Sequence, residues 1–435
     1  MTPLLPAETG WWDIAGPLVL LGLIAVWLVW LTRRQRHHLD VAAGRIVAIA
    51  VTVHVAVALV VGTIITGDAQ LLRSTTPDAF AYQPTIDGLI AAPLDGPDPA
   101  AWSDRGVYLY LAALVQGVFG GRKLAVVVLN AGLLGTSLLG LVVLTRELVG
   151  RRAVPVAAVL GAALPAVYLW ASTPIREALV LCLTVWCVAF AVLAVDRSSA
   201  ALLCAGVFVV VMAWTRGVQV PVLASAVVVA ALLLPQVRAW TAKWLARPSV
   251  LAAGSVALAA GALVAGSRLA RLAWRVTDRS AGHSFRLAVD TTTQVEGIAT
   301  PRPLDPLGLL GELPAGIVRF LVGPAPWQRP DGPVLLWLDA AVWWALAPLV
   351  IIGLWLAVQQ RCRPALVVVV TVVVGSVIGA LTLGNFGIIS RIRIHTWVLL
   401  VPFAAWAIVA AFDRFRARQR SGSSQPSDAH VGGRS

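Results

Sequence analysis

One carboxylate in the sequence stands where acid–base chemistry at a membrane surface could take place. Asp78 follows Pro77 in a polar connector and precedes Tyr82 by four residues. This spacing allows Asp78 and Tyr82 to share one face of a helix. A carboxylate held in this way could act as the general base on an acceptor hydroxyl. Asp78 could instead cap a short helix after the proline, and on spacing alone this structural role is favoured.

Two further acidic residues of the same connector could belong to that site. Asp68 follows Gly67 at the end of an apolar run, and Asp104 precedes Arg105 and a stretch that contains two tyrosines. Asp68 also fits a solvated helix end, which its position alone favours. Asp104 and Arg105 also fit a local ion pair on the surface. The sequence leaves these alternatives open.

Arginines in otherwise apolar surroundings form a second group of candidates. The segment Gly384–Arg393 (GNFGIISRIR) places Arg391 and Arg393 where the positive-inside rule predicts few basic residues. Arginine suits bidentate phosphate binding, and glycine lets a ligand approach the backbone closely. The segment therefore predicts a phosphate site in preference to plain anchoring at the membrane interface.

Two shorter motifs are compatible with the same chemistry. Arg176-Glu177 lies in the tight connector after Pro174. It could hold a lipid-linked phosphate, or it could be an ordinary helix start with a proline and a first-turn glutamate. Arg216 lies between two apolar runs. A charged residue at membrane depth is costly and often functional, although a long side chain can also extend to the interface.

Other kinds of site find little support. The four cysteines form no Cys-x-x-Cys pair and the histidines show no metal-ligand spacing, so neither a zinc site nor a disulfide framework is indicated. No phosphate-binding loop, dinucleotide fingerprint or nucleophile elbow is present. The net charge of +13 comes from basic residues in short connectors between apolar runs. The positive-inside rule and lipid headgroups explain it better than nucleic acid does.

The composition indicates which elements must position these residues. Of the 435 residues, 59% are hydrophobic and 13% are charged, and mean hydropathy is +0.83. The apolar runs are continuous, and hydrocarbon leaves no backbone polar group unsatisfied, so the sequence predicts an all-α polytopic transmembrane bundle. About eleven spans are expected, at Ile14–Leu31, Ile46–Thr66, Leu124–Thr145, Ala153–Trp170, Ala178–Val195, Ala201–Trp214, Val218–Leu234, Ser249–Ala265, Val334–Val358, Ala365–Leu383 and Ile394–Phe412.

Charges in the connectors predict an orientation. Basic clusters follow the first span and recur in alternate connectors, whereas the connector Gly67–Gly106 is acidic. We therefore expect the N-terminus outside and the C-terminus in the cytoplasm. The run Val107–Phe119 is too short to span and should be a surface or re-entrant helix. The abundance of Ala, Val, Leu and Arg is typical of a GC-rich bacterium, so the membrane would be the cytoplasmic (inner) membrane.

Three parts follow from this pattern. Residues 1–45 hold an extra N-terminal span and a basic connector, and residues 46–412 form the main transmembrane domain. Its outer loops, 67–123 and 267–332, should contain short juxtamembrane helices, because loops of this length are usually functional or disordered and these carry aromatic residues. Residues 413–435 are expected to form a basic, disordered cytoplasmic tail.

The order of the motifs resembles that of a known superfamily. Along the chain stand Asp78 and Tyr82, Tyr108, Phe119-Gly120, Leu164-Pro165, Trp170-Ala171-Ser172, Arg176-Glu177, Arg216, Pro324-Ala325-Pro326-Trp327, Asn385-Phe386-Gly387 and Arg391-Ile392-Arg393. This order resembles the GT-C superfamily of polyprenyl-phosphate-sugar-dependent glycosyltransferases. It is most similar to the branch of protein O-mannosyltransferases and aminoarabinose transferases. The resemblance runs from about Ile46 to Phe412, and Ala79 replaces the second acidic residue of many members.

The resemblance implies a reaction. Members transfer a sugar from an isoprenoid phosphate carrier to a glycan, lipid or protein acceptor on the outer face of the membrane, here in cell-envelope glycan assembly. It gives the role of general base to Asp78. The residues that would hold the substrate and the lipid phosphate are Tyr82, Asp104, Arg176, Glu177, Arg216, Arg391 and Arg393. A divalent cation could assist, although no ligand cluster indicates one.

Two other classes of function stay open. One is a lipid-linked glycan polymerase, flippase or transporter, for which broken helices and charges at mid-membrane are typical. Arg216 and the short apolar run before it are the features that point this way. The other is a non-catalytic envelope scaffold, which the missing acidic neighbour of Asp78 keeps open.

Overall fold

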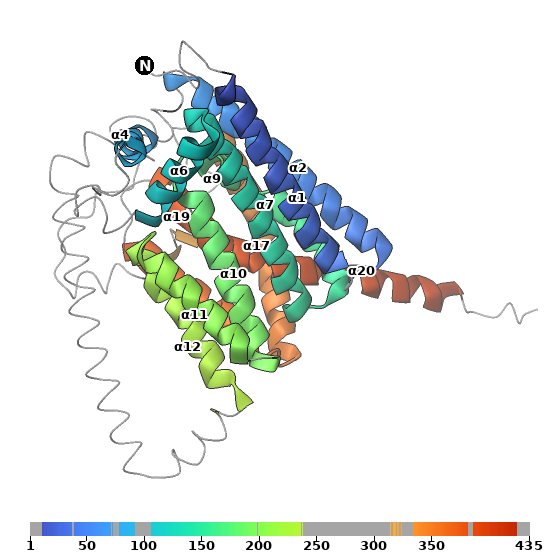
Figure 1. Cartoon of the computed structure of the whole chain (residues 1–435). Coiled ribbons are helices and arrows are strands. Elements are labelled where there is room, and N and C mark those ends of the chain that lie inside the picture. Colours follow the sequence, from blue (N-terminus) through green and yellow to red (C-terminus); the bar gives the residue numbers. More distant parts are fainter. Residues whose placement is uncertain are drawn as a thin grey trace, which may run out of the picture.

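The protein is a bundle of helices packed side by side (Figure 1). The computed structural model describes residues 11–36, 39–70, 72, 78–91, 106–197, 199–235, 237, 314, 316–318, 320–321, 323, 334–381 and 386–423. Within these ranges all regular structure is helical. The prediction of an all-α polytopic bundle is therefore confirmed. Most of the predicted outer loop 267–332 and the candidate span Ser249–Ala265 lie outside the described residues.

The helices of the first half of the chain include the short helices that were expected in the first outer loop, namely α4 and α6. Their bounds are α1 Trp12–Arg36, α2 Val41–Gly67, α4 Asp78–Ala91, α6 Gly106–Phe119, α7 Arg122–Leu148, η1 Arg151–Ala153, α8 Val154–Ala162, α9 Pro165–Ala171, α10 Glu177–Asp196, α11 Ser199–Ala213, η2 Gly217–Gln219 and α12 Val220–Leu233. Those of the second half are α17 Val334–Gln359, α18 Ala365–Leu381, α19 Phe386–Trp397, η3 Val398–Leu400 and α20 Val401–Ser423.

Two helices form the centre of the bundle. α7 and α10 pack against each other, and 83% of the most apolar stretch of each is buried inside the protein. A helix that is apolar on every side must be covered by other helices or by lipid. Here α2 and α8 cover α7, and α11 and α12 cover α10. α1 and α2, by contrast, bury only 28% and 33% of their apolar stretches, so most of their surface faces lipid.

The number of full-length spans is smaller than the sequence predicted. Six described helices are long and apolar enough to cross a membrane, and a bent helix pair gives up to seven. Ten of the eleven predicted segments are helical, but the segments at 201–214, 218–234 and 365–383 form helices of 17 residues or fewer. The expected count of about eleven came from apolar composition alone, which does not show where a helix breaks.

A break at Leu164-Pro165 divides the fourth predicted span. Leu164 is extended (φ −78°, ψ 110°), and Pro165 begins α9. Proline lacks the amide hydrogen that would continue α8 and disfavours helical geometry in the residue before it. The axes of the two halves differ by 56°. This bend leads the chain into the turn at residues 172–176, which precedes α10.

The C-terminal helix extends further than expected. The tail was predicted to be disordered from residue 413, but α20 continues through Ser423. The residues concerned (DRFRARQR) include four arginines, one alanine and one glutamine, which are strong helix formers, so the helix continues out of the bundle. Residues 424–435 lie outside the described residues.

The extra N-terminal helix forms hydrogen bonds with the bundle near both of its ends. Near its C-terminal end, Gln35 Oε1 accepts from Arg146 of α7 at 3.0 Å. Asp13 Oδ1 accepts from the backbone N–H of Gly121 at 3.0 Å, and Trp12 Nε1 donates to the carbonyl of Val118 at 3.1 Å. Gly121 is the N-cap of α7 and lies in the left-handed region (φ 67°). A glycine has no side chain to cap a helix, so α1 supplies the missing acceptor from another part of the chain.

We expect Asp13→Ala to lower the free energy of unfolding by about 1 kcal/mol, the usual effect of losing a helix cap. Asp13→Asn keeps a side-chain oxygen and should retain most of the stability. Unfolding of the detergent-solubilised protein, followed by tryptophan fluorescence, measures both. Equal losses in the two variants would show that the negative charge matters more than the hydrogen bond.

Candidate functional site

A buried carboxylate lies at the centre of the site. Glu177, the first residue of α10, is fully buried. Its Oε2 forms an ion pair with Arg216, which lies in the break between α11 and η2. Its Oε1 accepts from Nε of Arg391 in α19 at 2.5 Å. His395, one turn further along α19, places Nε2 3.1 Å from Oε2. Three side chains from two separate segments thus converge on one carboxylate.

Buried polar contacts fix the turn that presents Glu177. Asn130 of α7 is fully buried and donates from Nδ2 to the carbonyls of Thr173 and of Ile175, the latter at 3.2 Å. Trp170 Nε1 donates to Ser390 Oγ at 3.1 Å, which joins α9 to α19. Such bonds satisfy backbone groups that would otherwise be buried without partners. They also hold the N-terminus of α10 against α19, where Arg391 and His395 lie.

A third guanidinium lies beside the Glu177 pair. Arg176, the N-cap of α10, donates from one terminal nitrogen to the carbonyl of Thr215 at 3.1 Å. Thr215 immediately precedes Arg216, and Arg176 and Arg216 are close enough for their charges to interact. The described part of the cluster therefore contains three guanidinium groups and one carboxylate, Glu177. Guanidinium groups gathered in a buried place can bind an anionic ligand.

Helix α4 reaches the same cluster through Tyr82. Tyr82 and Tyr108 are both buried, and their rings contact each other with centroids 6.0 Å apart. Tyr82 lies within electrostatic range of Arg216, and Tyr108 within range of Glu177. A hydrogen bond of 3.1 Å from Gln83 Nε2 to Gln116 Oε1 also joins α4 to α6.

The acidic candidates of the first outer loop have different positions. Asp78 is the first residue of α4 and so lies one helical turn before Tyr82. Asp68 caps the C-terminus of α2, is exposed, and accepts from the N–H of Gln70 at 2.8 Å. This matches the interpretation of Asp68 as a solvated helix end. Asp104 lies outside the described residues.

Arg393 does not share the partners of Arg391. It is buried between Asp339 of α17, 3.3 Å away, the carbonyl of Gly323, and the ring of Trp397, whose centroid is 3.7 Å from the guanidinium carbon. The Asp339 carboxylate also lies 3.4 Å from the backbone nitrogen of Ala166 in α9. Arg393 thus joins α19 to α9 and α17, while Arg391 faces Glu177.

Helical geometry explains this separation, and it could have identified a residue that the sequence analysis missed. Residues two apart lie on opposite sides of a helix, whereas residues four apart lie on the same side. Arg391 and His395 therefore form one set and Arg393 another. His395 could have been found from this spacing once the segment was known to be helical. Asn130 and Asp339 gave no comparable signal, because single polar residues in apolar runs do not show which helix they will contact.

The described residues contain no group of three or more His, Cys, Asp or Glu side chains that could hold a metal ion. The acidic loop around Asp104 is outside those residues.

Comparisons with known proteins show what the fold is similar to. No family model matches this sequence, and no curated protein matches it either. Among solved structures, the oligosaccharyltransferase of the archaeon Archaeoglobus fulgidus in its apo form aligns at 14% identity with a TM-score of 0.51. The same archaeal enzyme, AglB, in complex with an inhibitory peptide and a dolichol-phosphate gives 14% identity and a TM-score of 0.52. Tethered to an acceptor peptide that contains the NVT sequon, it gives a TM-score of 0.51 at 14% identity.

These alignments cover most of this chain but only part of the archaeal one. The first two each include 90% of this chain and 53% of the other, and the third includes 89% and 52%. The chain thus spans about half the length of the proteins it matches. At this level of identity the shared feature is the fold alone, that of a multi-pass membrane bundle. The resemblance drawn from the order of the motifs stays a prediction.

Proposed function

We propose that this chain is a membrane glycosyltransferase that moves a sugar from a polyprenyl-phosphate carrier to an acceptor on the outer face of the membrane. One observation carries the proposal. Tyr82, four residues after Asp78, packs on Tyr108 beside the ion pair of Arg216 with Glu177. Asp78 begins this same helix α4, which supports a candidate base on the helix whose Tyr82 lies near the guanidinium groups.

The guanidinium cluster fits the leaving group of this reaction. When the bond between the sugar and the lipid phosphate breaks, negative charge develops on the phosphate oxygens, and preorganised cations stabilise that charge. We assign this role to Arg176, Arg216 and Arg391. Glu177 contacts the last two at the same time, so it orients their guanidinium groups before a ligand arrives. For Arg393 we propose a structural role, because its partners are Asp339 and Trp397.

The remaining step is activation of the acceptor. A hydroxyl oxygen of the acceptor attacks the anomeric carbon, its proton passes to the carboxylate of Asp78, and the bond from the anomeric carbon to the phosphate oxygen breaks. The lipid phosphate leaves with the electron pair of that bond. Asp78 is the proposed base, since it begins α4 one turn from Tyr82 and a positioned base is typically worth a factor of about 10²–10⁴ in rate.

The comparisons support the kind of donor. Structures of the archaeal oligosaccharyltransferase with a similar fold include a complex with an inhibitory peptide and a dolichol-phosphate and one tethered to an acceptor peptide. By analogy we propose an isoprenoid phosphate donor for this chain, with a glycan, lipid or protein as acceptor. Cell-envelope assembly in a bacterial inner membrane, with the N-terminus outside, completes the proposal and rests on the connector charges described above.

The test is release and transfer of radiolabelled sugar from polyprenyl-phosphate donors by the purified protein in proteoliposomes that contain acceptor extract. We expect Asp78→Asn to lower the rate at least about 100-fold, as expected for loss of a general base. Asp87→Asn is the matched control, because Asp87 lies on the same helix, is exposed, and contacts Gln83. Its rate should stay within about twofold of wild type.

The alternatives give different results in the same assay. If Asp78→Asn and Asp87→Asn both retain the wild-type rate, the base is not Asp78. If the wild-type protein leaves every donor intact but moves labelled donor between leaflets, the chain is a flippase or transporter. If it does neither in the presence of acceptor extract, the enzyme proposal fails.

A further inference from the structure

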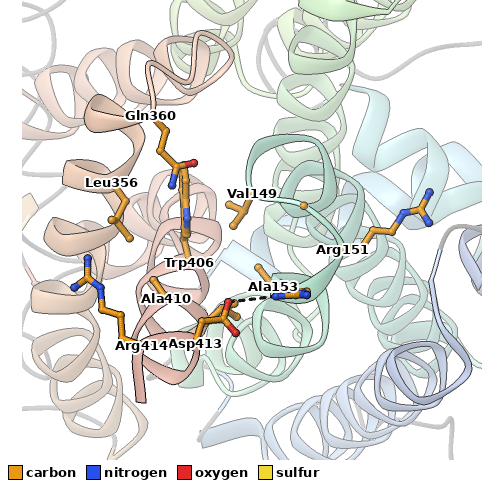
Figure 2. Close-up of a pocket in the computed structure, with 12 residues that line it drawn as sticks. Val149, Arg151, Ala153, Leu356, Gln360, Trp406, Ala410, Asp413 and Arg414 are labelled. Atoms are coloured by element: carbon orange, nitrogen blue, oxygen red, sulfur yellow. Dashed lines mark hydrogen bonds and ion pairs between the residues drawn. The ribbon is translucent and has the colours of Figure 1, made fainter. Parts of the chain in front are cut away.

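A cavity of about 480 Å³ opens at the other end of the bundle from Glu177. It lies between the turn that leads from α7 to α8, the C-terminal end of α17 and the middle of α20 (Figure 2). Helix α7 extends from the Glu177 site to the cavity. Asn130 of α7 contacts the turn before Glu177, and Val149, which follows the last residue of α7, lines the cavity. The helical rise between these residues is about 28 Å, close to the thickness of a hydrocarbon core of about 30 Å.

The cavity has an apolar wall and a basic rim. Leu356 and Trp406 are buried at its back. Arg151, Arg152 and Arg414 line it and are exposed. Figure 2 shows Arg414 beside Asp413, and Arg151 on the other side with its guanidinium group pointing away from Trp406 and Asp413. The sequence assigns this end of the helices to the cytoplasm, because basic connectors meet here.

One carboxylate lies in the same rim. Asp413 Oδ2 is 3.5 Å from a terminal nitrogen of Arg152 (dashed line in Figure 2). The two side chains are 49% and 82% exposed, and exposed pairs of this kind are weak. Three guanidinium groups and one carboxylate therefore line the cavity, and the Arg152 pair can open at little cost when a stronger anion arrives.

We propose that this cavity binds one anionic phospholipid of the cytoplasmic leaflet. Its phosphate lies between Arg152 and Arg414, where Arg151 can turn toward it from the rim, and the start of an acyl chain lies against Leu356 and Trp406. Charge complementarity selects an anionic headgroup, and the apolar wall selects a lipid over free phosphate. The cavity is also within the size range of small-molecule sites. This site is separate from the proposed donor site, at the opposite membrane surface.

The Asp413 carboxylate competes with the lipid phosphate for Arg152, so its removal should strengthen lipid binding. Asp413 holds Arg152 in the absence of lipid. Asp413→Asn removes that competitor and one negative charge from the rim, so it should tighten binding of an anionic lipid about two- to fivefold. A triple change of Arg151, Arg152 and Arg414 to Gln should weaken the same binding at least about tenfold, since each basic residue near an anionic membrane surface contributes to attraction.

The experiment is native mass spectrometry of the full chain released from nanodiscs that contain phosphatidylglycerol and phosphatidylcholine. The readout is the ratio of phosphatidylglycerol to phosphatidylcholine retained by the folded protein. The control changes Arg34, Arg45 and Arg363 to Gln, three exposed arginines that the cavity does not include. We expect the wild type and this control to retain one phosphatidylglycerol alike, and the pocket variant to lose it.

Two outcomes would overturn the proposal. One is equal loss in the pocket and control variants, which would show that only the total basic charge matters. The other is retention that Asp413→Asn leaves unchanged or weakens. Inorganic phosphate in large excess should not displace the lipid, and displacement would mean that the site binds phosphate without its lipid. Circular dichroism of each variant before release confirms that the helices are intact.

Discussion

Glu177→Gln should lower the free energy of unfolding by about 3–5 kcal/mol, the usual cost of removing one partner of a buried ion pair. The carboxylate is fully buried and contacts both Arg216 and Arg391. A neutral amide keeps the shape of the side chain but removes the charge that offsets these guanidinium groups. Unfolding in a denaturing detergent series, followed by tryptophan fluorescence, measures the loss.

A control and a rescue make the Glu177 prediction specific. Asp413→Asn removes a carboxylate from an exposed ion pair, so it should change the free energy of unfolding by no more than about 1 kcal/mol. Added polyprenyl phosphate should restore part of the stability of Glu177→Gln, because a ligand that binds the folded state stabilises it by mass action. Equal losses in the two variants would contradict a buried charge cluster, and absence of rescue would contradict phosphate binding there.

The second large effect is expected at Asp339 and Arg393. Both side chains are 1% exposed and lie 3.3 Å apart, so Asp339→Asn should also cost about 3–5 kcal/mol. This pair connects α17 to α19, and α9 joins it through the backbone of Ala166. The loss should therefore appear in global unfolding, with sugar transfer reduced only in proportion to the folded fraction.

A double variant separates the ion pair from its surroundings. Replacing a buried pair with apolar residues of similar size is often neutral. Asp339→Leu combined with Arg393→Met should therefore recover more than half of the stability lost in Asp339→Leu alone. Additive losses would mean that each residue acts through other contacts, such as the Gly323 carbonyl and the Trp397 ring.

The sequence predicted most of the residues that form this site but not which of them contact one another. Composition was sufficient for an all-helical membrane bundle, and unusual charges were sufficient to single out Arg176, Glu177, Arg216 and Arg391, which the structure brings together. What the sequence did not show was that Glu177 and Arg391 are partners, because they are 214 residues apart. Their contact depends on how α10 and α19 pack, and apolar periodicity carries no information about packing partners in a helix that is apolar on all sides.

The sequence also predicted the ends and breaks of the helices poorly. The short sixth segment suggested a break near Arg216, and α11 does end at Ala213, ahead of η2 at Gly217. The bend at Pro165 was hidden inside one long apolar run, because a proline can either kink a membrane helix or be accommodated by its neighbours. The extension of α20 to Ser423 was missed for the opposite reason, since charged residues indicate solvent but do not prevent a helix from continuing.

The short helices on one side of the bundle have a consequence for the surrounding lipid. α11 and α18 contain 15 and 17 residues, and α12 packs against both. At 1.5 Å per residue these helices are about 22 and 25 Å long, shorter than a typical hydrocarbon core of about 30 Å. Hydrophobic mismatch of this size is relieved by local thinning of the bilayer. Because α11 ends at Ala213, close to Arg216, we expect such thinning to bring the interfacial layer toward the guanidinium cluster. Such a protein should partition into thin membranes, and thick bilayers should strain it on the side of these short helices.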